Sequence, residues 1–406
     1  MKNFVSLIEF GLRIILISLI IGGVGCSSED NRDGEEEPIP EPPPVPLEAE
    51  IRLPSQGENG LFDPSLDQVP GSGRVYMSYS SVAPSLMWPM FNGHSVHTRL
   101  AYSDDGGRVW ADSNLALNEN KDVTLQVPEF AHHAGTWHSE VSKLAYDPRS
   151  GQWLLIWFRY LLINHERMFA HSWFSFKQAS LPENLPSATE YKLMGAGAYD
   201  SRNNTKDGST GSPIGAPPLM MLNQLHPELA RCGVISEPGI LVQGDSLYLA
   251  MNCHELLPVE ETRIILLRHR CSPLGCDYLD PAQWSFVSTL LAEADAQRLG
   301  FRNWTASDLF EYSGEFYILL TGTSNQPWER AYSGCEVFKF SNLDQGVLVS
   351  DGNGPVRFGS VIGGGERFRG ACAFHKGLTE GGILLSQAYP EDTRTFRLFR
   401  SFVLPQ

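Results

Sequence analysis

The 406-residue sequence predicts an all-β protein, a five-bladed β-propeller of four-stranded antiparallel blades. Two observations support this fold class. From residue 59 onward no long amphipathic helical pattern occurs, and short β-rich runs alternate with turns rich in Gly, Pro, Asp and Asn. One ordered pattern then recurs five times: an acidic or polar residue, a few apolar residues, a glycine-containing turn and an aromatic-aliphatic strand. Radial repetition of such units is typical of a propeller.

The five copies follow one another along the chain. Their paired segments are 63–66 with 73–79, 140–146 with 151–157, 237–242 with 244–249, 308–312 with 314–320, and a weaker 370–375 with 381–386. Later strand-like stretches complete about four strands per copy; they are 98–102, 169–176, 263–268, 336–340 and 395–402. The long interval 181–234 is expected to be a loop at the mouth of the propeller, with one short helix in 219–232.

The turn at 103–110, Ser-Asp-Asp-Gly-Gly-Arg-Val-Trp, adds a second sign of the same architecture. It resembles the Asp-box found in sialidases and many other propellers. In such a turn the Asp side chain caps the backbone, the glycines permit positive φ, and Trp packs beneath. The motif is structural, so it indicates the architecture and not the chemistry.

The N-terminus precedes the repeats and predicts export. Lys2 and Arg13 precede an apolar run at 14–21 that is short for a bilayer span, and small residues then lead into Cys26. This pattern resembles a bacterial lipoprotein signal, which implies cleavage after residue 25 and lipidation of Cys26. Ser27 after the cysteine implies, by the same resemblance, the outer membrane, with the protein periplasmic or surface-exposed.

The segment between the leader and the repeats is acidic and rich in proline. Residues 27–50 carry a net charge of −8 out of a total of −16, and they lack the apolar residues needed to fold. We therefore expect residues 26–50 to be an extended tether and residues 51–406 to be one propeller, acting as a monomer. The acidic balance also argues against a nucleic-acid partner.

The cysteines agree with an exported chain. Without Cys26, six remain, an even number that permits three disulfides. Cys271 and Cys276 are the most plausible local pair, because the four residues between them suit a tight turn. The other pairings stay open at this point. A zinc site is less favoured, because Cys-x4-Cys has no second matching pair.

Four of the five repeats begin with a carboxylate: Asp63, Glu140, Glu237 and Asp308. The first strand of each propeller blade lines the central channel, so these groups are expected to converge. Converging carboxylates repel one another, which raises some pKa values and leaves others low. That difference is what acid–base cleavage of a glycosidic bond requires.

On these residues the chain resembles the five-bladed glycoside hydrolases of family 43, the arabinanases and xylosidases. Phe62-Asp63-Pro64-Ser65 with Tyr76 is similar to the first-blade motif of the family, and Ser236-Glu237-Pro238 is similar to the third-blade motif. The resemblance implies that Asp63 is the general base, that Glu237 is the general acid and that Glu140 tunes the acid. Glu140 departs from the family, which has Asp there. It further implies an inverting reaction.

Other side chains near the same loops fit a saccharide pocket. We expect Asp308, His138, Trp304, Arg369, Trp88 and His94 to bind substrate, by stacking and by hydrogen bonding. Neither a catalytic metal nor a cofactor is expected, since the histidines lack a diagnostic spacing and no nucleotide-binding motif occurs. A structural cation in the central channel is compatible with the pattern.

Two alternatives remain. A sialidase-like enzyme needs a tyrosine nucleophile and three arginines around one pocket, and Arg52, Arg302 and Arg369 are the candidates. A non-catalytic glycan-binding propeller on the cell surface is the other alternative. It is favoured by the glutamate in the second repeat and by the weak fifth repeat.

Overall fold

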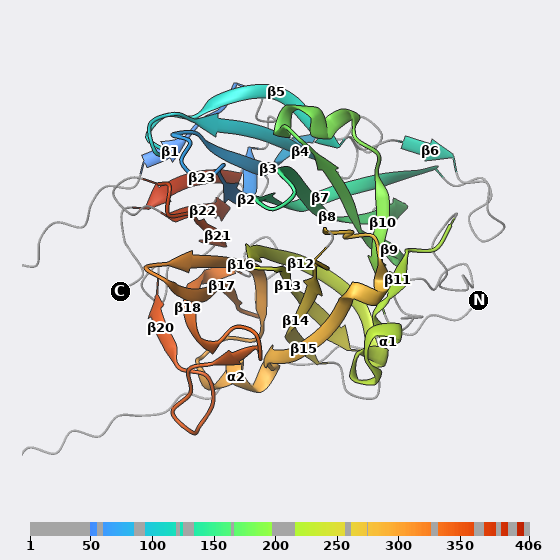
Figure 1. The fold of residues 1–406 in the computed structure, drawn as a ribbon, viewed down its shortest axis with the longest axis vertical. Coiled ribbons are helices and arrows are strands. Elements are labelled where there is room, and N and C mark those ends of the chain that lie inside the picture. The colour runs from blue at the N-terminus through green and yellow to red at the C-terminus, as the bar shows by residue number, and fades with distance from the viewer. Residues whose placement is uncertain are drawn as a thin grey trace, which may run out of the picture. The chain divides into compact units, whose positions relative to one another are not determined.

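A computed structural model describes most of the chain from residue 49 onward. The described ranges are 49–54, 60–84, 94–118, 122–124, 134–163, 166–196, 216–255, 261–273, 275–325, 332–360, 369–378, 383–388 and 396–401. Within them the strands form five largely antiparallel sheets, and Figure 1 shows these sheets set around a common centre. The predicted five-bladed β-propeller is confirmed. Among the described residues, no helix is long and apolar enough to cross a membrane.

The first two blades contain the N-terminal half of the described chain. Blade 1 has the order β2 (Leu61–Asp67), β3 (Val75–Pro84), β4 (His94–Ser103) and β5 (Ala111–Asn118). Blade 2 contains β7 (Ala134–Asp147), β8 (Gln152–Ile163), β9 (Glu166–Ala179) and β10 (Tyr191–Gly195). It also carries two short additions, β6 (Asp122–Thr124) beside β7 and β11 (Met220–Met221) beside β10. The four expected strands are therefore present in this blade, with one short strand added at each edge.

Blades 3 to 5 complete the circle. Blade 3 has the order β12 (Cys232–Gln243), β13 (Ser246–Glu255), β14 (Thr262–Arg270) and β15 (Trp284–Leu291). Blade 4 has β16 (Trp304–Tyr312), β17 (Glu315–Thr323), β18 (Tyr332–Asn342) and β19 (Val347–Leu348), and β20 (Arg357–Ser360) also pairs with β18. Blade 5 has β21 (Arg369–Phe374), β22 (Ile383–Ala388), β23 (Phe396–Ser401) and, outermost, β1 (Ala49–Ile51).

Strand β1 shows how the circle closes. It pairs with β23, with Ala49 opposite Arg400 and Ile51 opposite Leu398, so the last blade contains both ends of the described chain. The repeat pattern did not predict this strand, which lies before the first copy. The predicted tether, 26–50, therefore overlaps blade 5 by two residues.

Five strands, β2, β7, β12, β16 and β21, form what we call the inner ring (Figure 1). Each contacts the next around the circle, and β21 contacts β2. The blades pack through apolar side chains on either side of these strands. Trp153, Leu155 and Trp157 fill the interface of blades 1 and 2, whereas Phe158 and Phe174 face blade 3.

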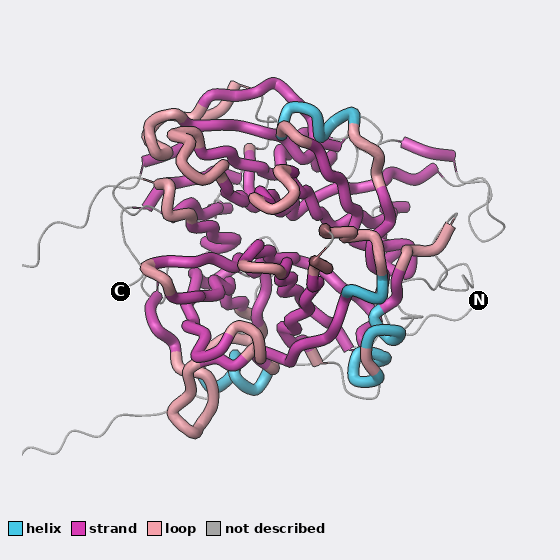
Figure 2. Tube along the Cα trace, in the orientation of Figure 1, coloured by secondary structure: helices cyan, strands magenta, loops and turns pink. Residues whose placement is uncertain are grey.

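The few helices lie outside the inner ring (Figure 2). A helix was expected in 219–232, and that stretch contains α1 (Leu222–Leu225) followed by η5 (Pro227–Arg231). The described parts of the interval 181–234 are not all loop, because η3 (Pro182–Ser187) and β10 also lie in them. The remaining helices are α2 (Glu293–Arg298) and η6 (Pro281–Gln283).

The turn at 103–110 joins β4 to β5 and has the geometry its residues require. One Asp105 oxygen accepts the backbone N–H groups of Arg108 and Val109 at 3.0 and 2.9 Å. Gly106 and Gly107 have φ values of 71° and 84°, and Trp110 is buried. The turn lies at the outer end of blade 1, away from the inner ring.

All six cysteines predicted to form disulfides are paired. The local pair Cys271–Cys276 is confirmed, and the other two bonds are Cys232–Cys253 and Cys335–Cys372. The first two stay within blade 3 or its turns. Cys335–Cys372 joins β18 of blade 4 to β21, the inner-ring strand of blade 5.

Candidate active site

Each strand of the inner ring contains a β-bulge at the same level. Two residues of the inner strand lie opposite one residue of its neighbour, and the first of the two has positive φ in every blade. These five residues are Asp63, Val141, Glu237, Ala306 and Ala371, with φ between 48° and 54°. Positive φ is unusual for residues other than glycine, and a bulge re-aims the side chain that it carries. The repeated bulge therefore sets the direction of one side chain per blade.

The bulges correct the register of the four predicted carboxylates. Asp63 and Glu237 occupy the same bulge position, whereas Glu140 lies one residue before it and Asp308 two residues after it. Proline follows the bulge residue in both matching blades, at Pro64 and Pro238. Proline is tolerated in these inner strands because a bulge position needs no ladder N–H. The sequence motif thus marks the bulge itself.

Asp63 is the buried member of the carboxylate cluster, which we define as Asp63, Glu140 and Glu237. Its residue surface is 2% exposed. Burial raises the pKa of Asp63 well above its ordinary value, and the charges of Glu237 and then Glu140 raise it further. Lys143 and Ser80 act in the opposite direction on the same pKa. The Ser80 hydroxyl lies near this carboxyl without reaching good hydrogen-bond geometry.

Glu237 and Glu140 are half-buried and lie on the next strands of the ring. The order β2, β7, β12 places Asp63, Glu140 and Glu237 on three consecutive inner strands. Glu237 affects the pKa of Asp63 more than Glu140 does, although β7 stands between their strands. Both glutamates therefore lie within electrostatic reach of the Asp63 carboxyl. The structure therefore brings the three predicted catalytic residues together.

Asp308 is also buried and has a different partner. Its Oδ1 is 3.4 Å from Nζ of Lys143, and its Oδ2 accepts the backbone N–H of Phe374 at 3.1 Å. Since β7 and β16 are not neighbours in the ring, this ion pair crosses it. Both side chains are buried, and burial raises the pKa of Asp308 while Lys143 lowers it. Asp308 was predicted to bind substrate, but its two oxygens are engaged within the protein.

A histidine–carboxylate contact lies farther along the inner ring, between the end of β2 and the residue after β21. His375 Nε2 is 3.1 Å from Asp67 Oδ1, and the His375 Nδ1 atom accepts the N–H of Gly377 at 2.9 Å. Nε2 therefore carries the proton that points to Asp67. Asp67 Oδ2 also accepts the N–H of Tyr146 from blade 2. These bonds join blades 5, 1 and 2 below the carboxylate cluster.

The other predicted ligand residues have varied positions. His138 is buried on β7, two residues before Glu140, and its ring lies 5.4 Å from that of Tyr160. Arg369 is half-buried at the start of β21, with its guanidinium 5.8 Å from the ring of Phe399. Trp304 is 1% exposed and packs in the core, so it offers no face for stacking.

Three predictions fall where the structure gives no side chain. Trp88 and Cys26 lie outside the described residues, and His94 opens β4 with its side chain likewise outside the description. The arginines of the sialidase alternative are dispersed. Arg52 follows the outermost strand β1 and pairs with Glu50, and Arg302 is exposed ahead of β16.

Lys143 is a site residue that sequence reasoning missed, and His254 is a second residue beside the cluster. Lys143 lies three residues after Glu140. Because the bulge inserts an extra residue between them, simple strand alternation does not predict where the Lys143 side chain lies. His254 Nε2 is 3.2 Å from the hydroxyl of Ser236, which adjoins Glu237, and its Nδ1 is 3.0 Å from Thr262 Oγ1. Burial lowers the pKa of His254 to about 4, so it is neutral at physiological pH.

Within the described residues, no group of three or more His, Cys, Asp or Glu side chains is placed to hold a metal ion. Lys143 supplies positive charge inside the inner ring, where a structural cation had been considered. Its ammonium lies near both Asp308 and Asp63.

Comparison with known proteins gives structural neighbours only. No protein-family model matches the chain, and no curated protein matches it. Solved structures similar to it include an exo-1,5-α-L-arabinanase from a bovine ruminal metagenomic library, at 15% identity and TM-score 0.39, covering 73% of this chain and 80% of that one.

A Bombyx mori β-fructofuranosidase of glycoside hydrolase family 32 matches at 11% identity and TM-score 0.49, covering 87% of this chain and 61% of that one. A family 43 β-1,3-galactosidase matches at 10% identity and TM-score 0.47, covering 87% and 94%. All three neighbours are glycoside hydrolases. At these identities and TM-scores the likeness carries no argument about the activity of this chain.

Proposed function

We propose that the chain is a glycoside hydrolase that cleaves an extracellular polysaccharide or oligosaccharide by carboxylate acid–base catalysis. The observation that carries this proposal is the carboxylate cluster on three consecutive inner strands, with unequal environments for its members. Asp63 is buried and has a raised pKa, whereas Glu140 and Glu237 are half-buried. Carboxylates whose environments separate their pKa values supply one acid and one base.

The family resemblance gives Asp63 the role of base and Glu237 the role of acid, with Glu140 tuning the acid. A raised pKa alone would favour Asp63 as the acid, so this assignment rests on the resemblance. A base acts only when ionised, and burial raises the pKa of Asp63. Activity should therefore rise with pH as Asp63 loses its proton, and fall when the acid loses its own. Lys143 favours the ionised form of Asp63 and so extends activity to lower pH.

The test is release of reducing sugar from plant, algal and bacterial polysaccharides. Glu237→Gln keeps the side-chain shape but removes the acid, and should lower the rate about 10²–10⁴-fold. Glu315→Gln, an exposed glutamate on β17, is the matched control and should keep full activity. Wild-type activity that Glu237→Gln retains would refute this assignment. Glycan binding without hydrolysis in any variant would instead indicate the non-catalytic alternative.

Inversion is the stereochemical outcome that we propose, following the same resemblance. Proton NMR of the first product formed distinguishes the anomers before mutarotation. A first product that retains the substrate configuration would refute inversion and leave the roles of the carboxylates to be reassigned.

We further propose that the propeller works outside the cytoplasm as a lipid-anchored, monomeric protein. Three paired disulfides support an oxidising compartment. Cys26→Ser should move the protein from the membrane fraction to the soluble fraction. Unchanged membrane association would contradict the anchor.

A further inference from the structure

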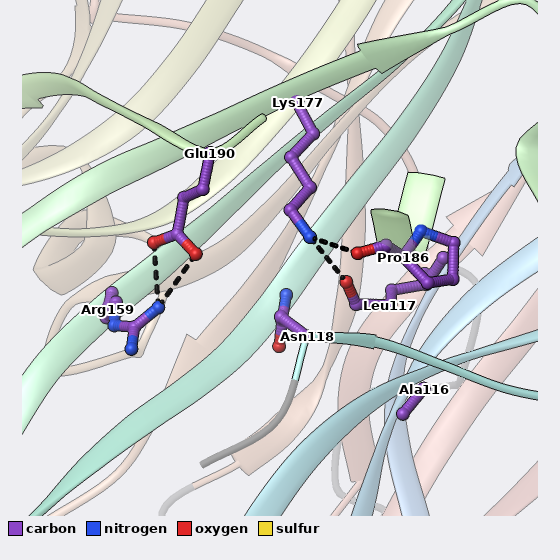
Figure 3. Close-up of a pocket in the computed structure, with 7 residues that line it drawn as sticks. All are labelled: Ala116, Leu117, Asn118, Arg159, Lys177, Pro186 and Glu190. Atoms are coloured by element: carbon purple, nitrogen blue, oxygen red, sulfur yellow. Dashed lines mark hydrogen bonds and ion pairs between the residues drawn. The ribbon is translucent and has the colours of Figure 1, made fainter. Parts of the chain in front are cut away.

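A polar pocket lies between blades 1 and 2 and shares no residue with the carboxylate cluster. Its volume is about 340 Å³, and Asn118, Arg159, Lys177, Pro186 and Glu190 line it together with neighbouring backbone (Figure 3). These residues come from the end of β5, from β8 and β9, and from the region of η3. Glu190 is exposed while Asn118 is buried, so the pocket opens at Glu190.

Asn118 is the unusual residue of this pocket. It is 6% exposed, and neither its Oδ1 nor its Nδ2 has a hydrogen-bond partner. A buried amide without partners is costly, so native proteins rarely keep one without a reason. Figure 3 shows Asn118 between the Arg159–Glu190 pair and Lys177. Its donor and acceptor are thus available to a ligand.

Further unpartnered polar atoms lie around the same interface. Arg159 Nε is buried without a partner, as are the hydroxyl of Thr98 and the indole N–H of Trp157. Thr98 is the cross-strand partner of Asn118, and Trp157 belongs to the apolar cluster of this interface. Several hydrogen-bonding groups therefore gather where apolar packing would otherwise be expected.

Both cationic side chains of the pocket are already engaged within the protein. Arg159 Nη1 donates to both oxygens of Glu190, at 2.7 and 3.0 Å. Lys177 Nζ donates to the carbonyls of Leu117 and Pro186, at 3.2 and 3.0 Å. An anion would meet the Glu190 carboxylate, and a cation would meet Lys177. A neutral ligand rich in hydroxyl groups fits best.

We propose that this pocket is a second binding site, which takes one neutral saccharide unit. Adjacent hydroxyl groups of a sugar each donate and accept, so a vicinal pair matches Oδ1 and Nδ2 of Asn118 together. The volume is at the lower end of small-ligand sites, as a single sugar unit requires. Trp137, half-buried and 5.7 Å from the Arg159 guanidinium, adds an aromatic surface nearby. The site needs none of the chemistry of the carboxylate cluster.

The experiment follows the side-chain amide of Asn118 by ¹⁵N–¹H NMR of the full chain. Asn118→Leu identifies the signal by its disappearance. Glucose, galactose, xylose and arabinose are added in turn, and glucuronate serves as the charged probe. We expect saturable shifts of this signal with at least one neutral sugar and a smaller shift with glucuronate. Asn184→Leu, on exposed η3, is the matched control and should leave the shifts unchanged.

Thermal unfolding of Asn118→Leu without ligand gives a second measurement. Leucine has a similar shape and removes two unpartnered polar atoms, so Tm should equal or exceed that of the wild type. A clear fall in Tm would show that Asn118 has a structural role and would overturn the proposal. So would the absence of any sugar-dependent shift, which would indicate a pocket filled only by water.

The two proposals fail separately. Glu237→Gln should lower the rate of hydrolysis about 10²–10⁴-fold and leave the Asn118 shifts intact. If no polysaccharide is cleaved but the Asn118 signal still shifts, the second site stands and the proposed hydrolase does not. If hydrolysis occurs without any such shift, the proposed hydrolase stands and the second site does not.

Discussion

Removal of the Lys143 ammonium should destabilise the inner ring more than any surface charge change. Lys143 and Asp308 have side chains only 4% and 7% exposed, and their charged atoms are 3.4 Å apart. With an effective dielectric constant of about 20, the attraction at this distance is about 5 kcal/mol. Lys143→Met keeps the apolar stem and leaves the Asp308 carboxylate buried without a counter-charge. We expect a loss of about 3–5 kcal/mol in the free energy of unfolding at pH 7.

The loss should depend on pH in a defined direction. Burial raises the pKa of Asp308 and Lys143 lowers it, so the variant should have a still higher pKa at this carboxyl. A group with a raised folded-state pKa favours folding when protonated, and this contribution disappears as pH rises through that pKa. The defect of Lys143→Met should therefore be smaller at pH 5 than at pH 7.

The assay is urea unfolding followed by tryptophan fluorescence, with the disulfides intact, at both pH values. Lys143→Met/Asp308→Asn should recover most of the loss, because asparagine is neutral and its oxygen can still accept the Phe374 N–H. Lys376→Met, which breaks the exposed pair with Glu311, is the control and should cost less than about 1 kcal/mol. A double variant as unstable as Lys143→Met alone would refute the reasoning.

Three further predictions concern the inner ring. Asp63→Asn should be inactive yet at least as stable as the wild type at pH 7, because burial and neighbouring carboxylates raise the Asp63 pKa. The gain in stability should vanish at about pH 4 and below, as Asp63 becomes protonated in both the folded and the unfolded protein. A lower urea midpoint than that of the wild type at pH 7 would contradict this prediction. Replacing Cys335 and Cys372 by alanine frees a loop of sequence separation 37 and should cost about 4 kcal/mol in urea unfolding; a cost below about 1 kcal/mol would show that the bond stabilises little. Gly239→Ala would place Cβ 2.8 Å from the Ser307 carbonyl oxygen and should lower the free energy of unfolding by about 1–3 kcal/mol. An unchanged Tm would contradict this and would mean that β12 and β16 separate without cost.

The repeats made the architecture predictable, because each blade brings its own hydrophobic pattern and turn residues. Asp63 and Glu237 were also predictable, since proline after an acidic residue marks the same bulge in two blades. The local pair Cys271–Cys276 followed from its spacing. These features depend on neighbouring residues, which a sequence displays directly.

The features that the sequence did not predict depend on contacts between residues that are distant in sequence. The bulges place Asp308 two residues past the level of Asp63, and an aligned repeat does not reveal such an offset. The Lys143–Asp308 pair joins blades 2 and 4 across the ring. Trp304 precedes Asp308 and suggested a stacking surface, but whether a tryptophan is buried depends on its neighbours in the next blade.

The closure of blade 5 has a consequence for the order of folding. Strands β2 to β20 form blades from continuous chain and can pair soon after they are made. Blade 5 cannot be completed until β23 has been synthesised. Its outermost strand β1 is synthesised before β23 but pairs only with β23, opposite Arg400 and Leu398. Contacts between such distant residues form slowly, since loop closure costs entropy before any packing is gained. The final and slowest event in folding should be the meeting of the two ends, when the open arc of blades becomes a ring.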